Sequence, residues 1–143
     1  MRRRCKDCAP ESKRPAPYPG PRCATHYRIY KNNARKTAHE RRMQGVYGLE
    51  PGEYDALYEY QGGVCAICRR ANGATRRLSV DHDHALVERD GLRRSIRGLL
   101  CRPCNDLLGH GRDDPEFFQR AIDYLNDPPA RRLIYGEREI DEG

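Results

Sequence analysis

The stretch GLLCRPCND, residues 98–106, carries one Cys-x-x-Cys pair, and VCAIC, residues 64–68, carries another. At this spacing two thiolates turn toward one ion, and two such pairs complete the tetrahedron of structural zinc. The 32 residues between the pairs exceed the usual zinc-ribbon spacing. We therefore expect the ion to clamp the base of an inserted unit. The four predicted ligands are Cys65, Cys68, Cys101 and Cys104.

A second set of ligands lies near the N-terminus, where Cys5-x-x-Cys8 is followed by Cys23-x-x-His26. The two sets together use all seven cysteines. An odd number of cysteines without a secretory signal disfavours a secreted disulfide protein. The alternative is that His26 is an ordinary residue at a helix start. Because only 37% of the chain is hydrophobic, the core is thin. Two structural zincs, each stabilising by on the order of 10 kcal/mol, would compensate for it.

Charge is distributed unevenly along the chain. Residues 1–44 carry 13 Lys or Arg and 3 acids, a net +10, and residues 69–102 carry a net +5. Residues 103–143 carry a net −5. The basic segments are typical of a polyanion partner, with DNA preferred, although a solvated surface has the same composition. No apolar run approaches twenty residues, so no membrane span is expected.

A basic helix is predicted at residues 27–44, which lack Pro and Gly. Its polarity on all sides predicts either a solvated spacer or a nucleic-acid contact. The predicted phosphate contacts are Arg35, Lys36, Arg41 and Arg42.

The other predicted elements make a small α+β protein. In chain order they are a helix at 51–60, a strand ending near Asp81, a turn at Asp90-Gly91, a returning strand at 95–100, a helix at 103–108, a helix at 115–126 capped by Asp114, and a loose charged tail at 127–143.

The sequence SVDHDHALV, residues 79–87, lies between the two cysteine pairs. It contains four more candidate ligands, Asp81, His82, Asp83 and His84. A carboxylate beside a histidine can place a hard cation such as Mg²⁺ or Mn²⁺ next to a general base. The amide of Asn105 is expected near the same ion, because zinc ties both segments together. Four exposed polar residues, or extra zinc ligands, are the alternatives.

The segments VCAIC, LSVDHDHALV and IRGLLCRPCNDLLGH resemble the phage recombination endonuclease VII family, which belongs to the His-Me finger (HNH) nucleases. The resemblance covers about residues 46–126. It implies a ββα-metal core with structural zinc below it. The expected organisation is a zinc knuckle at 1–26, the basic helix and a short connecting helix at 27–61, the nuclease domain at 62–126 and a flexible tail at 127–143.

Carried over by position, the resemblance implies that Asp81 and Asn105 hold the catalytic Mg²⁺ or Mn²⁺. His82 would be the general base and His84 would orient or stabilise the phosphate, while Asp83 receives no role. The implied function is a metal-dependent DNA endonuclease, either a junction resolvase or a nickase, acting in the cytoplasm of the bacterial host. A homodimer or a phage DNA-processing partner is left open. The alternative function is a catalytically silent zinc module that binds DNA or protein.

Overall fold

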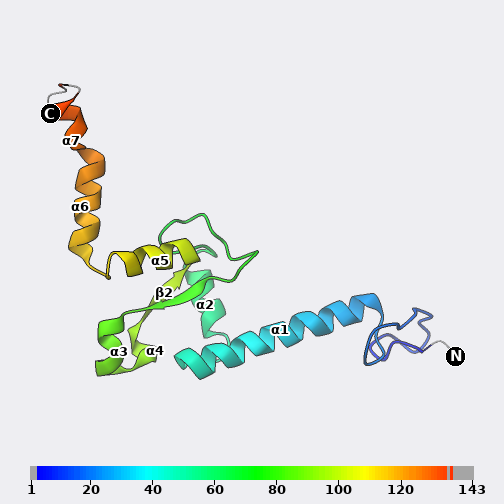
Figure 1. Ribbon diagram of the computed structural model, residues 1–143. Helices are drawn as coiled ribbons and strands as arrows, with labels where there is room; N and C mark the ends of the chain where they lie inside the picture. Colours follow the sequence, from blue (N-terminus) through cyan, green and yellow to red (C-terminus); the bar gives the residue numbers. More distant parts are fainter. Residues whose placement is uncertain (1–2, 135, 137–143) are drawn as a thin grey trace.

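The structure, a computed structural model, describes residues 3–134 and 136. It is a small α+β protein in which a two-stranded sheet lies among helices, as the sequence predicts. Two helical arms leave this centre in different directions (Figure 1): α1 (Ala24–Tyr47) leads to the N-terminal segment, and α6 (Pro115–Asn126) leads toward the C-terminus. Among the described residues, no helix is long and apolar enough to cross a membrane.

The sheet pairs β1 (Ser79–His82) antiparallel with β2 (Ile96–Leu100). Val80 and Leu99 lie opposite each other and are both buried. Around them lies the main core, whose buried members are Met43, Leu49, Tyr54, Cys65, Leu78, Val80, Leu99, Leu100 and Cys104. Two predicted zinc ligands therefore belong to the hydrophobic core itself.

The helix α1 is longer than the sequence predicts, because it passes through Gly45. It ends at Gly48, which adopts the left-handed conformation with a φ of 68°. The Gly48 N–H donates to the carbonyl of Gln44 at 2.9 Å, which satisfies an unpaired carbonyl at the helix end. Met43 is the buried residue of this helix. The helix is thus anchored at its C-terminal end, and its other side chains remain exposed or half-buried, in agreement with its polar composition.

The helix α2 (Glu53–Tyr60) covers the sheet and is followed by Gln61, whose side chain pairs with the edge of β2. Gln61 accepts a hydrogen bond from the Leu99 N–H at 2.7 Å and donates one to the Leu99 carbonyl at 2.9 Å. A Cβ atom at Gly98 would stand 3.0 Å from Gln61 Oε1. Glycine at this position therefore lets Gln61 lie against the strand.

The prediction that a turn at Asp90-Gly91 leads into the returning strand is wrong. Two short helices, α3 (His84–Asp90) and α4 (Leu92–Ser95), fill the connection. The side chain of Asp83 caps α3 by accepting from two amide groups of its first turn, which starts a helix directly after β1. Gly91, with a φ of 80°, then separates the two helices. The turn residues therefore mark a helix boundary.

The helix α5 (Arg102–His110) begins directly after Cys101 and follows β2 without a loop. The predicted helix α6 is confirmed, and Asp114 caps it by accepting from the Glu116 N–H at 2.9 Å. A further short helix, α7 (Pro129–Leu133), lies within the segment expected to be loose. Residues 135 and 137–143 of that segment lie outside the described residues.

Candidate active site

The four cysteines of the predicted core zinc site lie together, and they could hold a metal ion. The ligand atoms of Cys65, Cys68, Cys101 and Cys104 all lie within 4.8 Å of one another. One pair comes from the loop before β1, and the other spans the start of α5. The cluster therefore joins two segments that are far apart in sequence, as a structural zinc site does.

The surroundings shift the pKa values of the thiols of this cluster in opposite directions. Backbone N–H groups of Ala71 and Arg70 lower the pKa of Cys68 to about 6. Burial and the neighbouring thiols raise the pKa of Cys104 to about 12. Four thiolates cannot share this volume without a compensating cation. The donor set and its closeness both fit zinc.

The N-terminal cluster is also present and is assembled on the first turn of α1. His26 Nδ1 lies 3.4 Å from Cys5 Sγ, 3.2 Å from Cys8 Sγ and 3.4 Å from Cys23 Sγ. Burial raises the pKa of Cys5, but hydrogen bonds from the backbone of Cys23 and Asp7 outweigh it and lower that pKa to about 6. This geometry could hold a second zinc ion.

A cavity of about 280 Å³ opens beside the sheet. It brings together residues from the end of β1, the start of α3 and the middle of α5. The predicted site residues that line it are Asp81, His82, His84 and Asn105. Tyr47, Arg97 and Asp113 also line it. The structure therefore gathers all four residues of the predicted catalytic set in one place.

The local fold explains this gathering. Asp81 and His82 end β1, and Asp83 turns the chain into α3, so that His84 comes back toward the cavity. Asn105 follows Cys104 on α5, where its N–H donates to the Cys101 carbonyl at 3.0 Å. The cysteine cluster thus fixes the position of Asn105 relative to the sheet.

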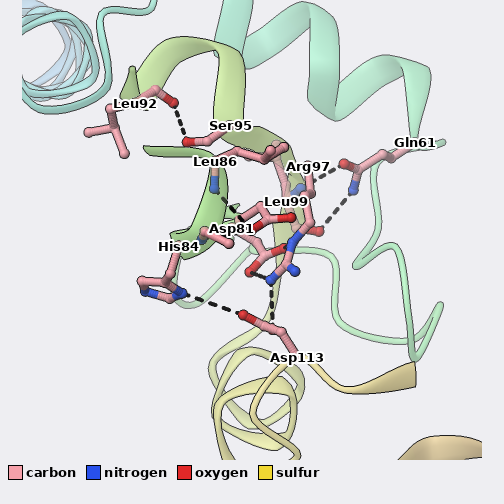
Figure 2. A network of polar contacts seen from close by, with 11 residues as sticks. Gln61, Asp81, His84, Leu86, Leu92, Ser95, Arg97, Leu99 and Asp113 are labelled. Atoms are coloured by element: carbon pink, nitrogen blue, oxygen red, sulfur yellow. Dashed lines mark hydrogen bonds and ion pairs between the residues drawn. The ribbon is translucent and has the colours of Figure 1, made fainter. Parts of the chain in front are cut away.

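A chain of ion pairs crosses the cavity (Figure 2). Arg97 donates to both carboxylate oxygens of Asp81, at 2.7 and 3.0 Å, and to Asp113 at 2.9 Å. His84 Nδ1 lies 3.4 Å from the second oxygen of Asp113. Asp81 is only 7% exposed, so this carboxylate depends on its positive partner.

Comparisons with known proteins show the family of the chain. A family model described as recombination endonuclease VII matches residues 40–127, which contain both the core cysteine cluster and the cavity. The chain belongs to the recombination endonuclease VII family. Membership suggests a nuclease role with DNA as the substrate. No solved structure matches the chain.

Two similar proteins are both called Gene 59 protein and come from mycobacterial phages. The one from Mycobacterium phage D29 is 52% identical over 141 residues, covering 96% of this chain and 81% of the relative. The one from Mycobacterium phage L5 is 50% identical over the same shares. The similarity therefore extends beyond the family match into the N-terminal part of the chain.

The two histidines of this endonuclease VII family site have different exposures. The His82 and His84 rings lie 4.6 Å apart, and Tyr47 lies 6.3 Å from His82. His82 is half-buried, whereas the His84 side chain is 75% exposed. His82 therefore sits deeper in the cavity, and His84 stands at its rim.

The sequence did not predict the two other charged residues of the cavity, Arg97 and Asp113. Burial raises the pKa of Asp113, but hydrogen bonds from Arg97 and His84 outweigh it and lower that pKa. The hydrogen bond to Asp81 raises the pKa of Arg97. Regular alternation along a strand does not predict the place of Arg97, because the pairing of β1 with β2 skips this residue. Asp113 lies in the turn after α5 and itself adopts the left-handed conformation, with a φ of 55°. No sequence pattern predicts its place in the cavity.

The four predicted phosphate contacts on α1 are exposed, but they do not share one face. Arg35 and Arg42 are seven residues apart and project in nearly the same direction. Lys36 projects from a different side of the helix, and its Nζ lies 3.6 Å from a carboxylate oxygen of Asp55. Arg41 projects from a third side. Arg28 and Lys31, which were not among the predicted contacts, project in the direction of Arg35 too. The four residues form a basic stripe within about 60° of the helix circumference. The α1 stripe consists of Arg28, Lys31, Arg35 and Arg42.

Proposed function

We propose that this protein is a metal-dependent DNA endonuclease of the HNH type, with residues 62–126 as its nuclease domain. The observation that carries the proposal is that Asp81, His82 and Asn105 line one cavity beside the core cysteine cluster. The antiparallel pair β1–β2 followed by α5 supports a ββα-metal core. The phage relatives support action in the cytoplasm of a bacterial host.

The donor set fits a hard divalent cation. A carboxylate at Asp81 and an amide oxygen at Asn105 are oxygen ligands, which Mg²⁺ and Mn²⁺ prefer. When bound there, the cation neutralises charge on the phosphate and on the departing 3′ oxygen. Both residues are held by rigid elements, a strand end and the first turns of a helix clamped by the cysteines.

His82 acts as the general base. Its half-buried ring faces the cavity, where it takes a proton from the water that attacks the scissile phosphorus. His84 stands at the rim, 4.6 Å from His82 between ring centres, and orients the phosphate. Attack breaks the bond between phosphorus and the 3′ oxygen.

The N-terminal segment holds the DNA. Residues 1–26 form the second zinc knuckle, and the α1 stripe runs from that knuckle toward the cavity. From Arg28 to Arg42 the stripe extends along about 21 Å of helix, which is long enough to contact several phosphates of a duplex.

The test is cleavage of supercoiled plasmid, linear duplex and a four-way junction, each with Mg²⁺, Mn²⁺ or EDTA. We expect metal-dependent cleavage by wild type, and its loss in His82→Ala with zinc content and folding retained. His110→Ala is the matched control, because His110 is exposed on α5 and does not line the cavity. Nicked plasmid indicates a nickase, and preferential junction cleavage indicates a resolvase. Wild-type protein that stays inert on all three substrates with both metals contradicts the proposal.

A further inference from the structure

Arg97 occupies an irregular position in the sheet. Asp81 is paired with Gly98, and His82 is paired with Ile96, so the register skips Arg97. Such a β-bulge turns a side chain out of the regular alternation and is a common device beside functional sites. Here it brings the guanidinium into the cavity lined by Asp81 and Asn105.

The guanidinium holds the carboxylate that is proposed to bind the cation. Both oxygens of Asp81 accept from Arg97, at 2.7 and 3.0 Å. The Asp81 side chain is 9% exposed and that of Arg97 is 33% exposed, so the pair is partly shielded from water. A divalent cation at these oxygens would stand beside the positive guanidinium, and the two like charges would repel each other. We therefore expect cation binding to displace Arg97 from Asp81.

Asp113 gives the displaced guanidinium a second partner. Arg97 Nη2 donates to Asp113 at 2.9 Å, in addition to its bonds with Asp81. Asp113 is itself held by His84, whose Nδ1 lies 3.4 Å away. Arg97 can thus leave Asp81 and stay in the cavity, bound to Asp113. The N–H groups that had donated to Asp81 are then available to another ligand in the cavity. A planar fork of donors that fits a carboxylate also fits a phosphate.

The net charge of the cavity is consistent with the replacement of Arg97 by a cation at Asp81. Two carboxylates and one guanidinium, those of Asp81, Asp113 and Arg97, sum to −1. A divalent cation changes the sum to +1, and the single charge of a phosphodiester returns it to zero. The cavity is therefore balanced when cation and DNA are bound together.

We propose that Arg97 is an exchangeable cation: it neutralises Asp81 before metal binding, and then, anchored by Asp113, it binds the DNA phosphate once a divalent cation takes Asp81. This inference rests on the proposed nuclease function. Arg97 is a substrate-binding residue in this scheme, and Asp113 is a positioning residue. A purely structural ion pair would have no such exchange.

The test is Mn²⁺ binding by zinc-loaded, DNA-free protein, measured from the free-Mn²⁺ signal in electron paramagnetic resonance. Removing the competing guanidinium in Arg97→Met should tighten Mn²⁺ binding by about five- to tenfold. The same variant should cleave DNA more slowly at saturating Mn²⁺ and show a higher KM for DNA, because its phosphate partner is lost. Tighter metal binding together with weaker cleavage is the signature of exchange.

Two further variants keep the test decisive. Arg97→Lys keeps the positive charge but loses the two parallel N–H donors of the guanidinium, so it should tighten Mn²⁺ binding by only about two- to threefold. This variant tests the exchange even if Arg97→Met does not fold. Arg93→Met removes another guanidinium paired with a carboxylate, Glu53, outside the cavity, and should leave Mn²⁺ affinity unchanged.

The outcomes separate this inference from the proposed function. Unchanged or weaker Mn²⁺ binding by folded Arg97 variants, with wild type binding Mn²⁺ and cleaving DNA, overturns the exchange alone. Wild-type protein that neither binds Mn²⁺ nor cleaves overturns both.

Discussion

The two cysteine clusters share a ligand chemistry but differ in what surrounds them. Cys65 and Cys104 of the core cluster are buried among Val80, Leu99 and other apolar side chains of the main core. The N-terminal cluster has its own small core, in which Ala16 is the buried residue beside the cysteines. Between the two clusters, residues 24–42 of α1 contain no buried side chain. The two clusters therefore lie in separate cores that an exposed helix joins.

The difference indicates which cluster supports the candidate active site. Cys101 and Cys104 lie at the start of α5, directly before Asn105, so the core cluster sets the geometry of the cavity. The N-terminal cluster fixes only its own loops and the first turn of α1. The family match, which begins at residue 40, agrees with this division, whereas the phage relatives extend across both units.

The largest effect is expected from Cys65→Ser. Cys65 is fully buried, and loss of its zinc removes on the order of 10 kcal/mol of stabilisation from a thin core. We expect the variant to lose cooperative thermal unfolding, one zinc per chain and all cleavage. Calorimetry and metal analysis measure these changes. Retention of a folded core with wild-type cleavage would show that the cluster does not support the cavity.

Cys23→Ser should have a more local effect. It should release one zinc and unfold the N-terminal loops, because Cys23 is both a ligand and the residue before α1. The main core should keep its thermal transition, and DNA binding should weaken. Hydrogen exchange resolves the two units, with protection lost before residue 24 and kept in β1 and β2. Loss of protection throughout the chain would contradict the separation of the units.

The α1 stripe should set the salt dependence of DNA binding. Arg35→Gln and Arg42→Gln, which remove two charges from the stripe, should each reduce the slope of log affinity against log salt by about 0.9. Arg41→Gln changes the same charge on another side of the helix and should leave the slope nearly unchanged. Fluorescence anisotropy over a salt series distinguishes them. Equal effects of Arg41 and Arg42 would mean that only total charge matters.

The smallest effect concerns the clamp between α2 and α4. A hydrogen bond from Arg93, with help from the backbone of Glu50, lowers the pKa of Glu53 from its ordinary 4.5 to about 2. A lowered pKa stabilises the fold fully above 4.5, and this stabilisation is lost only as the pH falls toward 2. Glu53→Gln should therefore lower the thermal midpoint slightly, by the same amount at about pH 5 and about pH 8. A difference that varies between these pH values would contradict the assignment.

Some of this structure could be predicted from sequence because the determinants are local. Cys-x-x-Cys spacing, the Asp114 cap and the composition of α1 each act within a few residues, and each predicted its element. The helices α3 and α4 were not predicted. The pattern around Asp83 suggests metal ligands, whereas the Asp83 side chain caps α3. The helix end at Gly48, beyond Gly45, depends on a left-handed conformation that either glycine can adopt.

The candidate catalytic residues were partly predictable for the same reason. Asp81 and His82 are adjacent, and the neighbouring cysteines connect them to Asn105. Arg97 and Asp113 could not be predicted in this way. The first depends on a bulge in strand pairing, and the second on a turn after α5, so both depend on tertiary structure.

The central claim is that chemistry belongs to the core unit and DNA affinity to the N-terminal unit. Single-turnover cleavage, measured against protein concentration for wild type, His82→Ala and Cys23→Ser, tests it most directly. His82→Ala should reach half-maximal rate at the wild-type concentration, with a maximal rate about 10²–10⁴ lower. Cys23→Ser should reach the wild-type maximal rate, but only at higher protein concentration. A near wild-type maximal rate for folded His82→Ala, or a maximal rate for Cys23→Ser as low as expected for His82→Ala, would contradict the account.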